Sequence, residues 1–405
     1  MIAPEKLDVA IVGAGPVGLF LGHLLVQRGL SIRLFERRQD RDVVSTSGRS
    51  ASSARQQSVL SRAIGIHPVS LELMQPLDLA APLIAAGRVI RRGHALRHMN
   101  DAMGTLDFHT LPGPFPFVLS IPQNETERIL EERLIARAGL AVLERGSEVM
   151  GLDAHDDDGV VLRLKRACGE HEVHASWVVG CDGKQSTIRQ LANLAFEGTP
   201  YADHFVMGDF SDNTPFGAEA AIFLHPAGLI ESFPLPHEKR RWVVRTTEEV
   251  TEAVGDVLVQ IVNERVGHDL SQTERFMESP FGVQHLLAEK MARGRVLLAG
   301  DAAHIVSPIG GQGMNLGFKD AQRLALAFDE IAAGTPPERA FARYDRQSRK
   351  VAARATRRSA FYMRLGRPQR SPFWRDQALR LLLATPLRSL IARVFTMRGL
   401  EPTPS

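Results

Sequence analysis

The sequence predicts an α/β fold in which a strand–helix–strand unit opens the chain, a strand-rich segment occupies the middle, and helices close it. Three observations support this prediction. A short apolar run at residues 8–12 ends in a glycine-rich turn and leads into an apolar stretch with helical spacing. Short apolar runs separated by Pro, Gly and His turns fill residues 195–250, and the pattern from residue 321 onward is almost entirely helical and arginine-rich. A chain of 405 residues is long enough for two or three domains with a large buried core.

The composition is that of an ordinary globular protein. Hydrophobic residues make up 44% and charged residues 23%, which excludes the disordered, collagen-like and disulfide-rich classes. Cys168 and Cys181 are too few and too far apart for a zinc knuckle or a redox pair, so we expect no metal site and a reducing compartment. The apolar stretch at residues 7–26 has acidic residues where a signal peptide would be positively charged, and no window is long enough to span a membrane. We therefore expect a cytoplasmic protein.

The first unit has the pattern of a dinucleotide-binding motif. Gly13, Gly15 and Gly18 lie between the first strand and its helix, and a second apolar run at residues 31–35 ends at Glu36. Gly13 permits a tight turn, Gly15 lets the backbone approach a pyrophosphate, and Gly18 lets the helix pack on the strand. The helix N-terminus offers free N–H groups and the positive end of its dipole to the phosphates. Glu36 follows at a position where a carboxylate can accept the ribose hydroxyls, so the unit predicts a bound dinucleotide.

Two later motifs each place a strand before a turn that contains glycine. In the first, an apolar run leads to Asp182 and Gly183 and then to a helix start, with Ser186 as the expected N-cap. Read alone, this motif indicates no particular chemistry. In the second, a buried strand delivers Asp301 at its carboxyl end, where ligands bind in open α/β sheets.

The loop after Asp301 is the most distinctive part of the second motif. It contains Pro308, Gly310, Gly311, Gly313, Met314 and Asn315. Its glycines leave backbone N–H groups open at a helix start, which suits an anionic or electron-rich ring edge. So many glycines beside Asp, Pro and Asn argue against a plain connecting loop.

The three motifs, in this order and spacing, resemble those of the class A FAD-dependent monooxygenases, the para-hydroxybenzoate hydroxylase-like family. The resemblance covers about the first 345 residues. It implies that the first unit binds FAD, that the Asp182 motif serves both FAD and NAD(P)H, and that Asp301 holds the ribityl chain. It also implies that the loop from Pro308 to Asn315 lies against the isoalloxazine ring.

The resemblance assigns residues to the cofactor site but identifies no catalytic acid or base. The implied FAD-binding positions are Gly13, Gly15, Gly18, Glu36, Arg37, Arg62, Gln123, Asp182, Gly183, Asp301, Pro308, Gly311, Gly313, Met314 and Asn315. The flavin-facing residues Pro308, Gly310 and Gly311 are the nearest candidates for a catalytic role. His225 and His304 are interpreted as structural, because a lone histidine usually is.

The implied function is a single-component, flavin-dependent hydroxylase. In this family NADPH or NADH reduces a non-covalently bound FAD, and a flavin C4a-hydroperoxide formed with O2 hydroxylates the substrate. The expected substrate is an aromatic, polycyclic or quinone-like small molecule of secondary metabolism or of aromatic or quinone metabolism. The alternative is epoxidation, Baeyer–Villiger oxidation or reduction on the same scaffold, since these reactions differ in pocket shape. A non-catalytic flavoprotein is a further alternative, against which the three intact motifs argue.

The same motifs divide the chain into expected domains. A discontinuous FAD-binding domain comprises residues 1–75, 115–190 and 285–345. An interleaved substrate-binding domain comprises residues 76–114 and 191–284, followed by a helical basic segment at 346–405. We expect a monomer or a homodimer.

Charge is concentrated near the C-terminus. Residues 341–400 hold 15 Arg or Lys and two acids, a balance of +13, whereas the whole chain has +3 and the remainder therefore −10. A solvated helical face is the simplest interpretation, with weak contact to a membrane surface or an acidic carrier protein as the alternative. No nucleic-acid-binding motif is present, so nucleic acid is not an expected partner.

Overall fold

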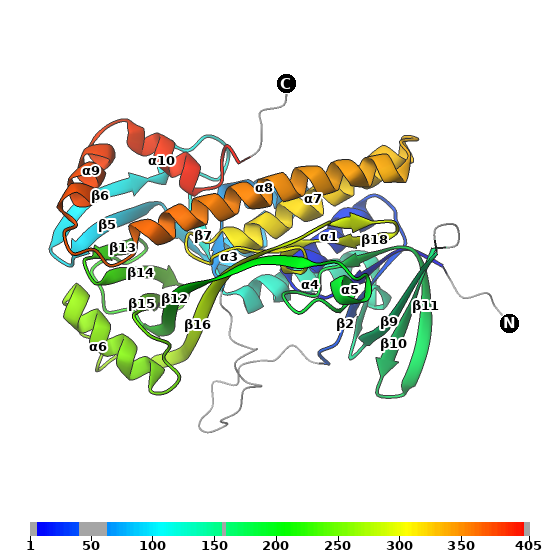
Figure 1. Cartoon of the computed structure of the whole chain (residues 1–405), viewed down its shortest axis with the longest axis horizontal. Helices are drawn as coiled ribbons and strands as arrows, with labels where there is room; N and C mark the ends of the chain where they lie inside the picture. The colour runs from blue at the N-terminus through cyan, green and yellow to red at the C-terminus, as the bar shows by residue number, and fades with distance from the viewer. Residues whose placement is uncertain (1–5, 40–62, 156–158, 401–405) are drawn as a thin grey trace.

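Two large β-sheets, a small third sheet and flanking helices make up the computed structural model (Figure 1). The structure describes residues 6–39, 63–155 and 159–400.

The first sheet contains the strand–helix–strand unit. Its path has the order β17-β18-β11-β1-β2-β8, and strands β18, β11, β1, β2 and β8 run parallel. The strands are β1 (Leu7–Val12), β2 (Ile32–Glu36), β8 (Leu143–Arg145), β9 (Glu148–His155), β10 (Gly159–Arg166), β11 (Gly169–Gly180), β17 (Ala292–Arg293) and β18 (Val296–Leu298). Strands β9 and β10 continue antiparallel from β11. The central strands are almost continuously apolar because a parallel sheet is covered by helices on its faces.

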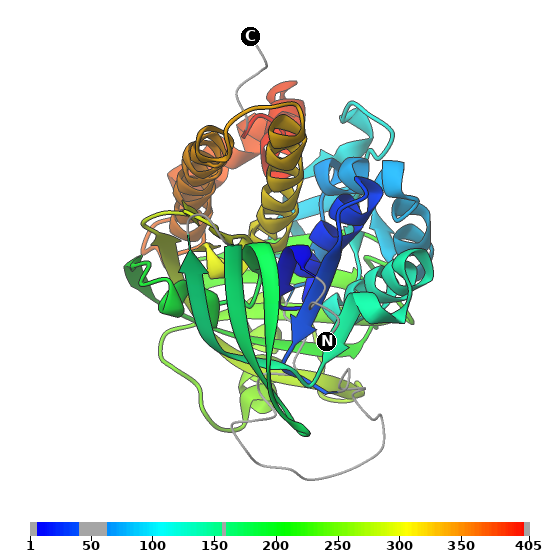
Figure 2. The same ribbon diagram turned by 90° about the vertical axis from the view of Figure 1, so that its right-hand side faces the viewer.

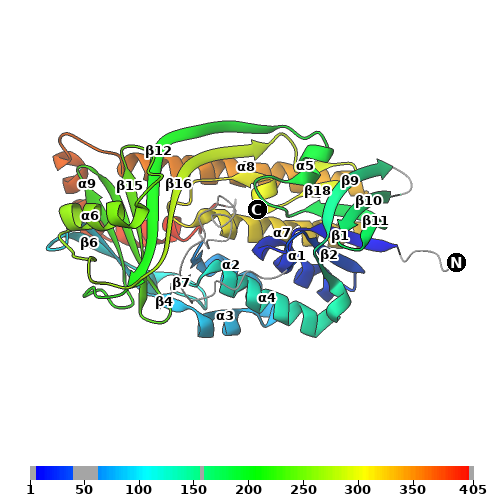
Figure 3. The same cartoon turned by 90° about the horizontal axis from the view of Figure 1, so that it is seen from below.

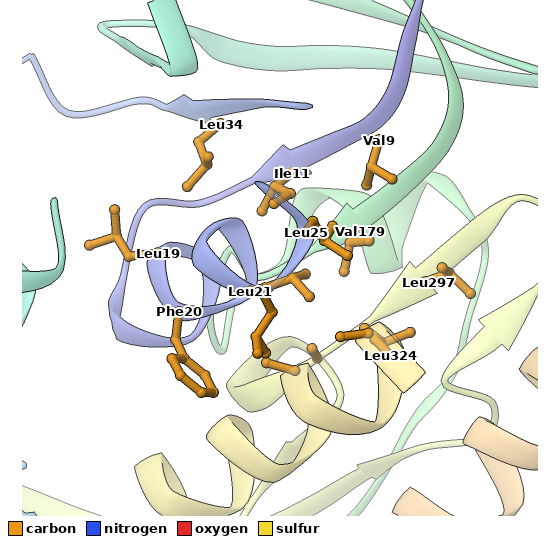
Figure 4. Packing of buried hydrophobic residues seen from close by; sticks show 14 of the residues in the cluster. Val9, Ile11, Leu19, Phe20, Leu21, Leu25, Leu34, Val179, Leu297 and Leu324 are labelled. Carbon is orange, nitrogen blue, oxygen red and sulfur yellow. The ribbon is translucent and has the colours of Figure 1, made fainter. Parts of the chain in front are cut away.

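Helices α1 (Pro16–Gln27) and α7 (Gln312–Ala332) pack together against this sheet. Pro16 suits the first position of a helix, where its missing N–H would have no partner within the helix. Figure 4 shows Leu21 and Leu25 of α1 gathered with Ile11, Val179 and Leu324 in the largest apolar cluster of the protein. This packing holds the amino ends of α1 and α7 near the carboxyl edge of the sheet.

Shorter elements connect the two large sheets. The small sheet has the order β3-β7-β4, formed by β3 (Gly65–Ile66), β7 (Val118–Ser120) and β4 (Arg88–Ile90). The helices of this region and of the first sheet are α2 (Pro68–Met74), α3 (Ala80–Ala86), α4 (Gln123–Ala138) and α5 (Thr187–Leu191). Single 3₁₀ turns cover Gln75–Leu77, Phe108–Thr110, Leu140–Val142 and Gly300–Ala302.

The second large sheet has the order β19-β16-β12-β15-β14-β13-β5-β6. Its strands are β5 (Arg92–His98), β6 (Asp101–Asp107), β12 (Phe196–Ser211), β13 (Ala220–His225), β14 (Gly228–Leu235), β15 (Lys239–Thr246), β16 (Arg275–Ala288) and β19 (His304–Ile305). The long strands β12 and β16 pair with each other and run from this sheet toward β18 of the first (Figure 3).

The two faces of the second sheet meet different partners. Helix α6 (Val254–Val266) covers one face, where its Leu258 and Val262 pack with Trp242 and Phe210. On the other face, Phe205 and its neighbours pack with residues of α8 and of the loop that precedes α7. This second face is the one that approaches the predicted cofactor site.

The C-terminal helices are part of the folded body. They are α8 (Pro337–Leu365), α9 (Phe373–Ala384) and α10 (Leu387–Phe395). Helix α8 runs beside α7 (Figures 1 and 2), and α9 and α10 pack against β6. Arg354 and Arg358, two of the basic residues of α8, donate hydrogen bonds to the carbonyl oxygens of Leu400 and Val394 at 2.8 and 2.7 Å. These two arginines therefore help to hold the tail in place. None of the helices in the described ranges has the length and apolarity needed to cross a bilayer.

The structure confirms the predicted α/β fold and most of its elements, with two omissions. Ser186 is the N-cap of α5, as predicted, and its Oγ accepts a hydrogen bond from the N–H of Arg189 at 3.0 Å. Helix α6 was missed, because residues 191–284 were interpreted as strand-rich throughout. Residues 80–120 mix short runs with Gly and Pro, a pattern that predicts strands and loops and misses helix α3. The division into domains stays a prediction.

Candidate functional site

Four strand ends of the first sheet meet at one edge and carry the predicted motifs. Strands β18, β11, β1 and β2 are neighbours and parallel, so their carboxyl ends lie side by side. The residues at these ends are Gly300 and Asp301 after β18, Cys181 and Asp182 after β11, Gly13 after β1, and Glu36 at the end of β2. Backbone hydrogen bonds join them, including Gly13 N–H to Phe35 O at 2.8 Å and Cys181 N–H to Val12 O at 2.7 Å. Motifs that are distant in the chain thus form one continuous edge.

In the glycine turn between β1 and α1, Gly13 and Gly18 have no room for a side chain, whereas Gly15 faces open space. Gly13 has φ +102°, and a Cβ atom there would lie 2.5 Å from the carbonyl oxygen of Cys181. A Cβ on Gly18 would lie 2.0 Å from the carbonyl oxygen of Gly13. A Cβ on Gly15, in contrast, would meet nothing within 4 Å. Because Gly15 is also the N-cap of α1 and has no side chain to cap it, the first N–H groups of this helix face open space that fits a pyrophosphate.

Glu36 is a buried carboxylate tied to this turn. Its Oε2 accepts a hydrogen bond from the N–H of Ala14 at 2.9 Å, and its Oε1 accepts one from the N–H of Arg38 at 3.0 Å. Burial alone would raise the pKa of Glu36, but these donors and the Arg38 guanidinium outweigh it and hold the pKa below its usual range. An ionised carboxylate retains acceptor capacity for ribose hydroxyls. The adjacent Arg37 is exposed.

Two aspartates lie farther along the same edge. Asp182 Oδ2 accepts a hydrogen bond from the N–H of Ile188 at 3.1 Å, whereas its buried Oδ1 has no hydrogen-bond partner among the described residues. Burial raises the pKa of Asp182. Asp301 is exposed at this edge, and the protein atoms around its carboxyl group raise its pKa by desolvation against the opposing charges of His304 and Lys184. A carboxyl oxygen without a partner at such an edge fits a ligand that supplies hydroxyl donors.

The loop before α7 is held open by glycines and braced by Asn315. Gly310 and Gly311 have φ values of +83° and +64°, and Gly311 is the N-cap of α7. Asn315 Oδ1 accepts hydrogen bonds from His67 N–H at 2.8 Å and Ser70 Oγ at 2.7 Å, and its Nδ2 donates to the carbonyl oxygens of Gly65 and Gly311 at 2.8 Å each. The side chain of Asn315 therefore clamps the loop to the segment that begins α2.

Two buried side chains beside this loop were not singled out from the sequence. His67 Nε2 lies 3.1 Å from the carbonyl oxygen of Gly310 and so carries the ring proton, and burial lowers the pKa of His67 to about 4. Gln312 is fully buried, and neither its Oε1 nor its Nε2 has a partner within the described ranges. Gln312 stands inside the glycine loop, but only the fold reveals that its amide has no partner. An unpaired amide at this point fits the polar edge of a flavin ring.

The remaining predicted positions lie around this edge or outside the described ranges. Gln123 begins α4, and its Nε2 donates to Glu127 Oε1 at 2.8 Å. Gly313 and Met314 lie in the first turn of α7, and Pro308 is exposed just before it. Arg62 lies outside the described residues.

The two histidines interpreted as structural have local partners. His304 is buried with its Nε2 2.5 Å from Asp320 Oδ2. Burial would lower the pKa of His304, but the Asp320 carboxylate outweighs burial and raises it. His225 Nδ1 accepts a hydrogen bond from the N–H of Ala227 at 3.1 Å within its own turn.

This edge has the features needed to hold FAD. The resemblance implies that the open turn at Gly15 would take the pyrophosphate, Glu36 the ribose, Asp301 the ribityl chain and the loop before α7 the ring, with Asp182 serving both FAD and NAD(P)H. The unpaired oxygen of Asp182 and the unpaired amide of Gln312 fit a ligand with matching polar groups. The fold and this site define an FAD-binding α/β flavoprotein with a second sheet packed against the loop before α7.

The comparisons with known proteins name the family. The profile of the FAD binding domain matches residues 6–359, and the chain belongs to this family of FAD-dependent aromatic monooxygenases. The 12-dehydrotetracycline 5-monooxygenase/anhydrotetracycline 6-monooxygenase of Streptomyces rimosus subsp. rimosus is 31% identical over 369 residues, which cover 86% of this chain and 67% of that protein. Pentachlorophenol 4-monooxygenase of Sphingobium chlorophenolicum is 30% identical over 347 residues, which cover 80% of this chain and 59% of that protein. The chain thus spans about two thirds or less of the length of these relatives.

A solved structure supports the fold over the whole chain. The crystal structure of p-nitrophenol 4-monooxygenase from Pseudomonas putida DLL-E4 superposes with a TM-score of 0.84 and covers 99% of this chain and 100% of that one. Its sequence identity is 22%, so it supports the fold alone. Together these findings confirm the sequence-based predictions of family, fold, FAD and a flavin-dependent monooxygenase. The roles of the individual site residues stay predictions.

Proposed function

We propose that this chain is a single-component hydroxylase that uses NADPH or NADH and O2 to hydroxylate an aromatic, polycyclic or quinone-like small molecule. The proposal rests on the convergence of the glycine turn, Glu36, Asp182 and Asp301 at one sheet edge, beside an apolar face of a second sheet. Relatives named for anhydrotetracycline and pentachlorophenol oxidation support an aromatic substrate. When bound, FAD would supply the redox chemistry by accepting electrons from the nicotinamide and activating O2.

The apolar face provides the surroundings that such a reaction needs. Phe205, Met207 and Val243 of the second sheet form a cluster with Ile309 of the loop before α7 and Met363 of α8. An aromatic substrate held here would lie between the sheet and the loop that is expected to face the flavin. Apolar walls exclude water, and a fixed orientation of the two reactants is a large part of catalysis in such sites. The N–H groups of the glycine loop would face the electron-rich edge of the ring system.

The test is anaerobic mixing of the FAD-loaded protein with NADPH and then NADH while flavin absorbance is followed. We expect the flavin to bleach, and to bleach faster when a suitable phenolic or polycyclic aromatic compound is present. In air, the same compound should gain one oxygen atom, detectable by mass spectrometry. Bound flavin that neither nicotinamide reduces under any condition would contradict the single-component reading and favour a partner reductase or an oxidase.

A second proposal concerns the C-terminal helices, which we infer make weak contact with an anionic membrane surface. Exposed large apolar side chains gather at the end of α8 and on α9 and α10, with Trp374 79% exposed. They are Phe361, Phe373, Trp374, Leu381, Leu382, Leu387 and Leu390. The two acids of this segment are engaged within the protein, since Asp345 accepts a hydrogen bond from Met291 N–H and Asp376 pairs with Arg375. Aromatic and aliphatic side chains beside exposed arginines are the chemistry that binds anionic lipid headgroups.

Point substitutions test this contact without removing the tail, whose Leu383, Ala392 and Leu400 are buried. Wild type should sediment with vesicles that contain anionic phosphatidylglycerol and not with pure phosphatidylcholine, and the Phe373→Ser/Trp374→Ser variant should bind several-fold less. Equal binding of the two proteins, or association of the wild type into a dimer through this surface, would contradict lipid contact. The choice between monomer and homodimer stays a prediction, which sedimentation velocity of the protein without vesicles tests.

A further inference from the structure

Glu231 on β14 is a buried carboxyl group on the inner face of the second sheet. The residue is 5% exposed, and it forms no hydrogen bond or ion pair within the part of the chain that the structure describes. Its cross-strand neighbours are Ile222 of β13 and Val243 of β15, both apolar. A carboxyl group in such a place weakens folding, because its polar atoms lose most of their water and gain no hydrogen bond from the described residues. A role outside folding is therefore the more economical explanation.

The direction of the Glu231 side chain follows from strand alternation. Ile230 belongs to the cluster under α6, whereas Leu229 belongs to the cluster that contains Ile309 and Met363. Side chains two residues apart on a strand share a face, so Glu231 lies on the face of Leu229. This is the face that meets Ile309 of the loop before α7 and the end of α8.

The charged groups around Glu231 are already paired with one another. On β15, Arg241 binds Asp209 at 2.6 and 2.8 Å, and Arg245 binds Asp203 at 2.8 Å. Arg367, just after α8, also binds Asp203 at 2.8 Å, and Arg97 of β5 lies 3.8 Å from Asp376 of α9. Tyr362 of α8 is a further titratable group on this side, and burial raises its pKa. Among the described residues no cation pairs with Glu231, and burial raises the pKa of Glu231 to about 8.

We propose that Glu231 binds the substrate: its carboxyl group hydrogen-bonds a carbonyl or hydroxyl oxygen of an uncharged aromatic ring held between the second sheet and the loop before α7. The inference rests on the proposed function and adds a substrate class to it. A protonated carboxyl group both donates and accepts a hydrogen bond, which matches aromatic ketones, quinones and phenols. An aromatic carboxylate would place a second acid against this apolar wall, so the site selects against anionic substrates.

A matched pair of ligands tests the proposal. Xanthone and xanthene share one tricyclic skeleton, but only xanthone has a carbonyl oxygen, and neither titrates. We expect the FAD-loaded wild type to bind xanthone about tenfold more tightly than xanthene, as one buried hydrogen bond allows. Glu231→Gln, which keeps a donor and an acceptor, should retain this preference, and Glu231→Leu should lose it. The exposed Glu197→Leu on β12 is the matched control and should behave as wild type.

The pH dependence and the stability supply two independent readouts. Xanthone affinity of the wild type should fall as pH rises through about 8, where the carboxyl group loses its proton, and stay flat in Glu231→Gln. Glu231→Leu should unfold at a higher urea concentration than wild type, because an unpaired buried polar group is removed. A wild type with no preference for xanthone, or a less stable Glu231→Leu variant, would overturn the proposal. Flavin content and nicotinamide-dependent bleaching of the wild type are measured first, so a failure of the proposed function is seen separately.

Discussion

Replacing Gly15 by alanine distinguishes an effect on FAD binding from an effect on the stability of the fold. Gly15 has φ −73° and ψ −179°, a conformation that any residue adopts, and a Cβ atom there would meet nothing within 4 Å. The substitution also reduces the entropy of the unfolded chain, so we expect the apoprotein to gain roughly 0.4–1 kcal/mol in free energy of unfolding. The new methyl group projects into the space where the pyrophosphate would approach the backbone.

The expected loss of FAD affinity follows from that crowding. Inserting a methyl group into a closely fitted contact costs about 1–3 kcal/mol, which corresponds to roughly fivefold to hundredfold weaker binding. The assay is FAD titration of the apoprotein, followed by flavin fluorescence, together with urea unfolding of the same preparation. Gly282→Ala is the matched control, because Gly282 lies in β16 of the second sheet and also has open space around it.

The outcome of the two measurements decides the interpretation. Weaker FAD binding with unchanged or raised stability supports a pyrophosphate at Gly15. Unchanged FAD affinity in Gly15→Ala would refute the placement of the cofactor at this turn. Gly18→Ala provides the contrast: its Cβ would lie 2.0 Å from the carbonyl oxygen of Gly13, so it should lower stability as well as affinity.

Three further predictions concern the framework of the site. Asn315→Leu removes the partner of the groups that Asn315 hydrogen-bonds in the wild type. We therefore expect the free energy of unfolding, measured in urea, to fall by about 2–4 kcal/mol. A fall below about 0.5 kcal/mol would contradict the bracing role. The pKa of His304 is raised in the folded state, so its pairing with Asp320 stabilises the protein fully below the ordinary histidine pKa of about 6.5. This stabilisation is lost as pH rises through the folded pKa. Asp320→Asn should therefore flatten the pH dependence of the free energy of unfolding, and an unchanged profile would count against the pairing. Gly104→Val should loosen α9, because a Cβ at Gly104 would lie 2.5 Å from Leu383 Cβ; faster limited proteolysis within α9 is the expected result, and a wild-type cleavage rate would contradict it.

The sequence alone determined the elements whose chemistry is local. The turn from Gly13 to Gly18, the acid at the end of β2 and the capping of α5 by Ser186 depend on residues close together in the chain. Their spacing therefore predicts their geometry. Three such motifs in one order also identified the family and with it the cofactor. Helix α6 was within reach of the same reasoning, because its buried Leu258, Val262 and Val266 recur every four residues.

Only the tertiary structure decided which distant residues meet. Asn315 forms hydrogen bonds with His67 and Ser70, which lie about 245 positions earlier in the chain. Periodicity in a sequence indicates that a residue is buried but does not show which residues it packs against. The charge pattern of the basic tail predicts a solvated face, yet Arg398 pairs with Glu72 and Arg367 with Asp203, because the tail folds back on helix α2 and on the second sheet. Nothing in the sequence pattern marks Glu231 as isolated. Its isolation arises from the pairing of β13, β14 and β15, which surrounds it with apolar neighbours and turns it toward the loop before α7.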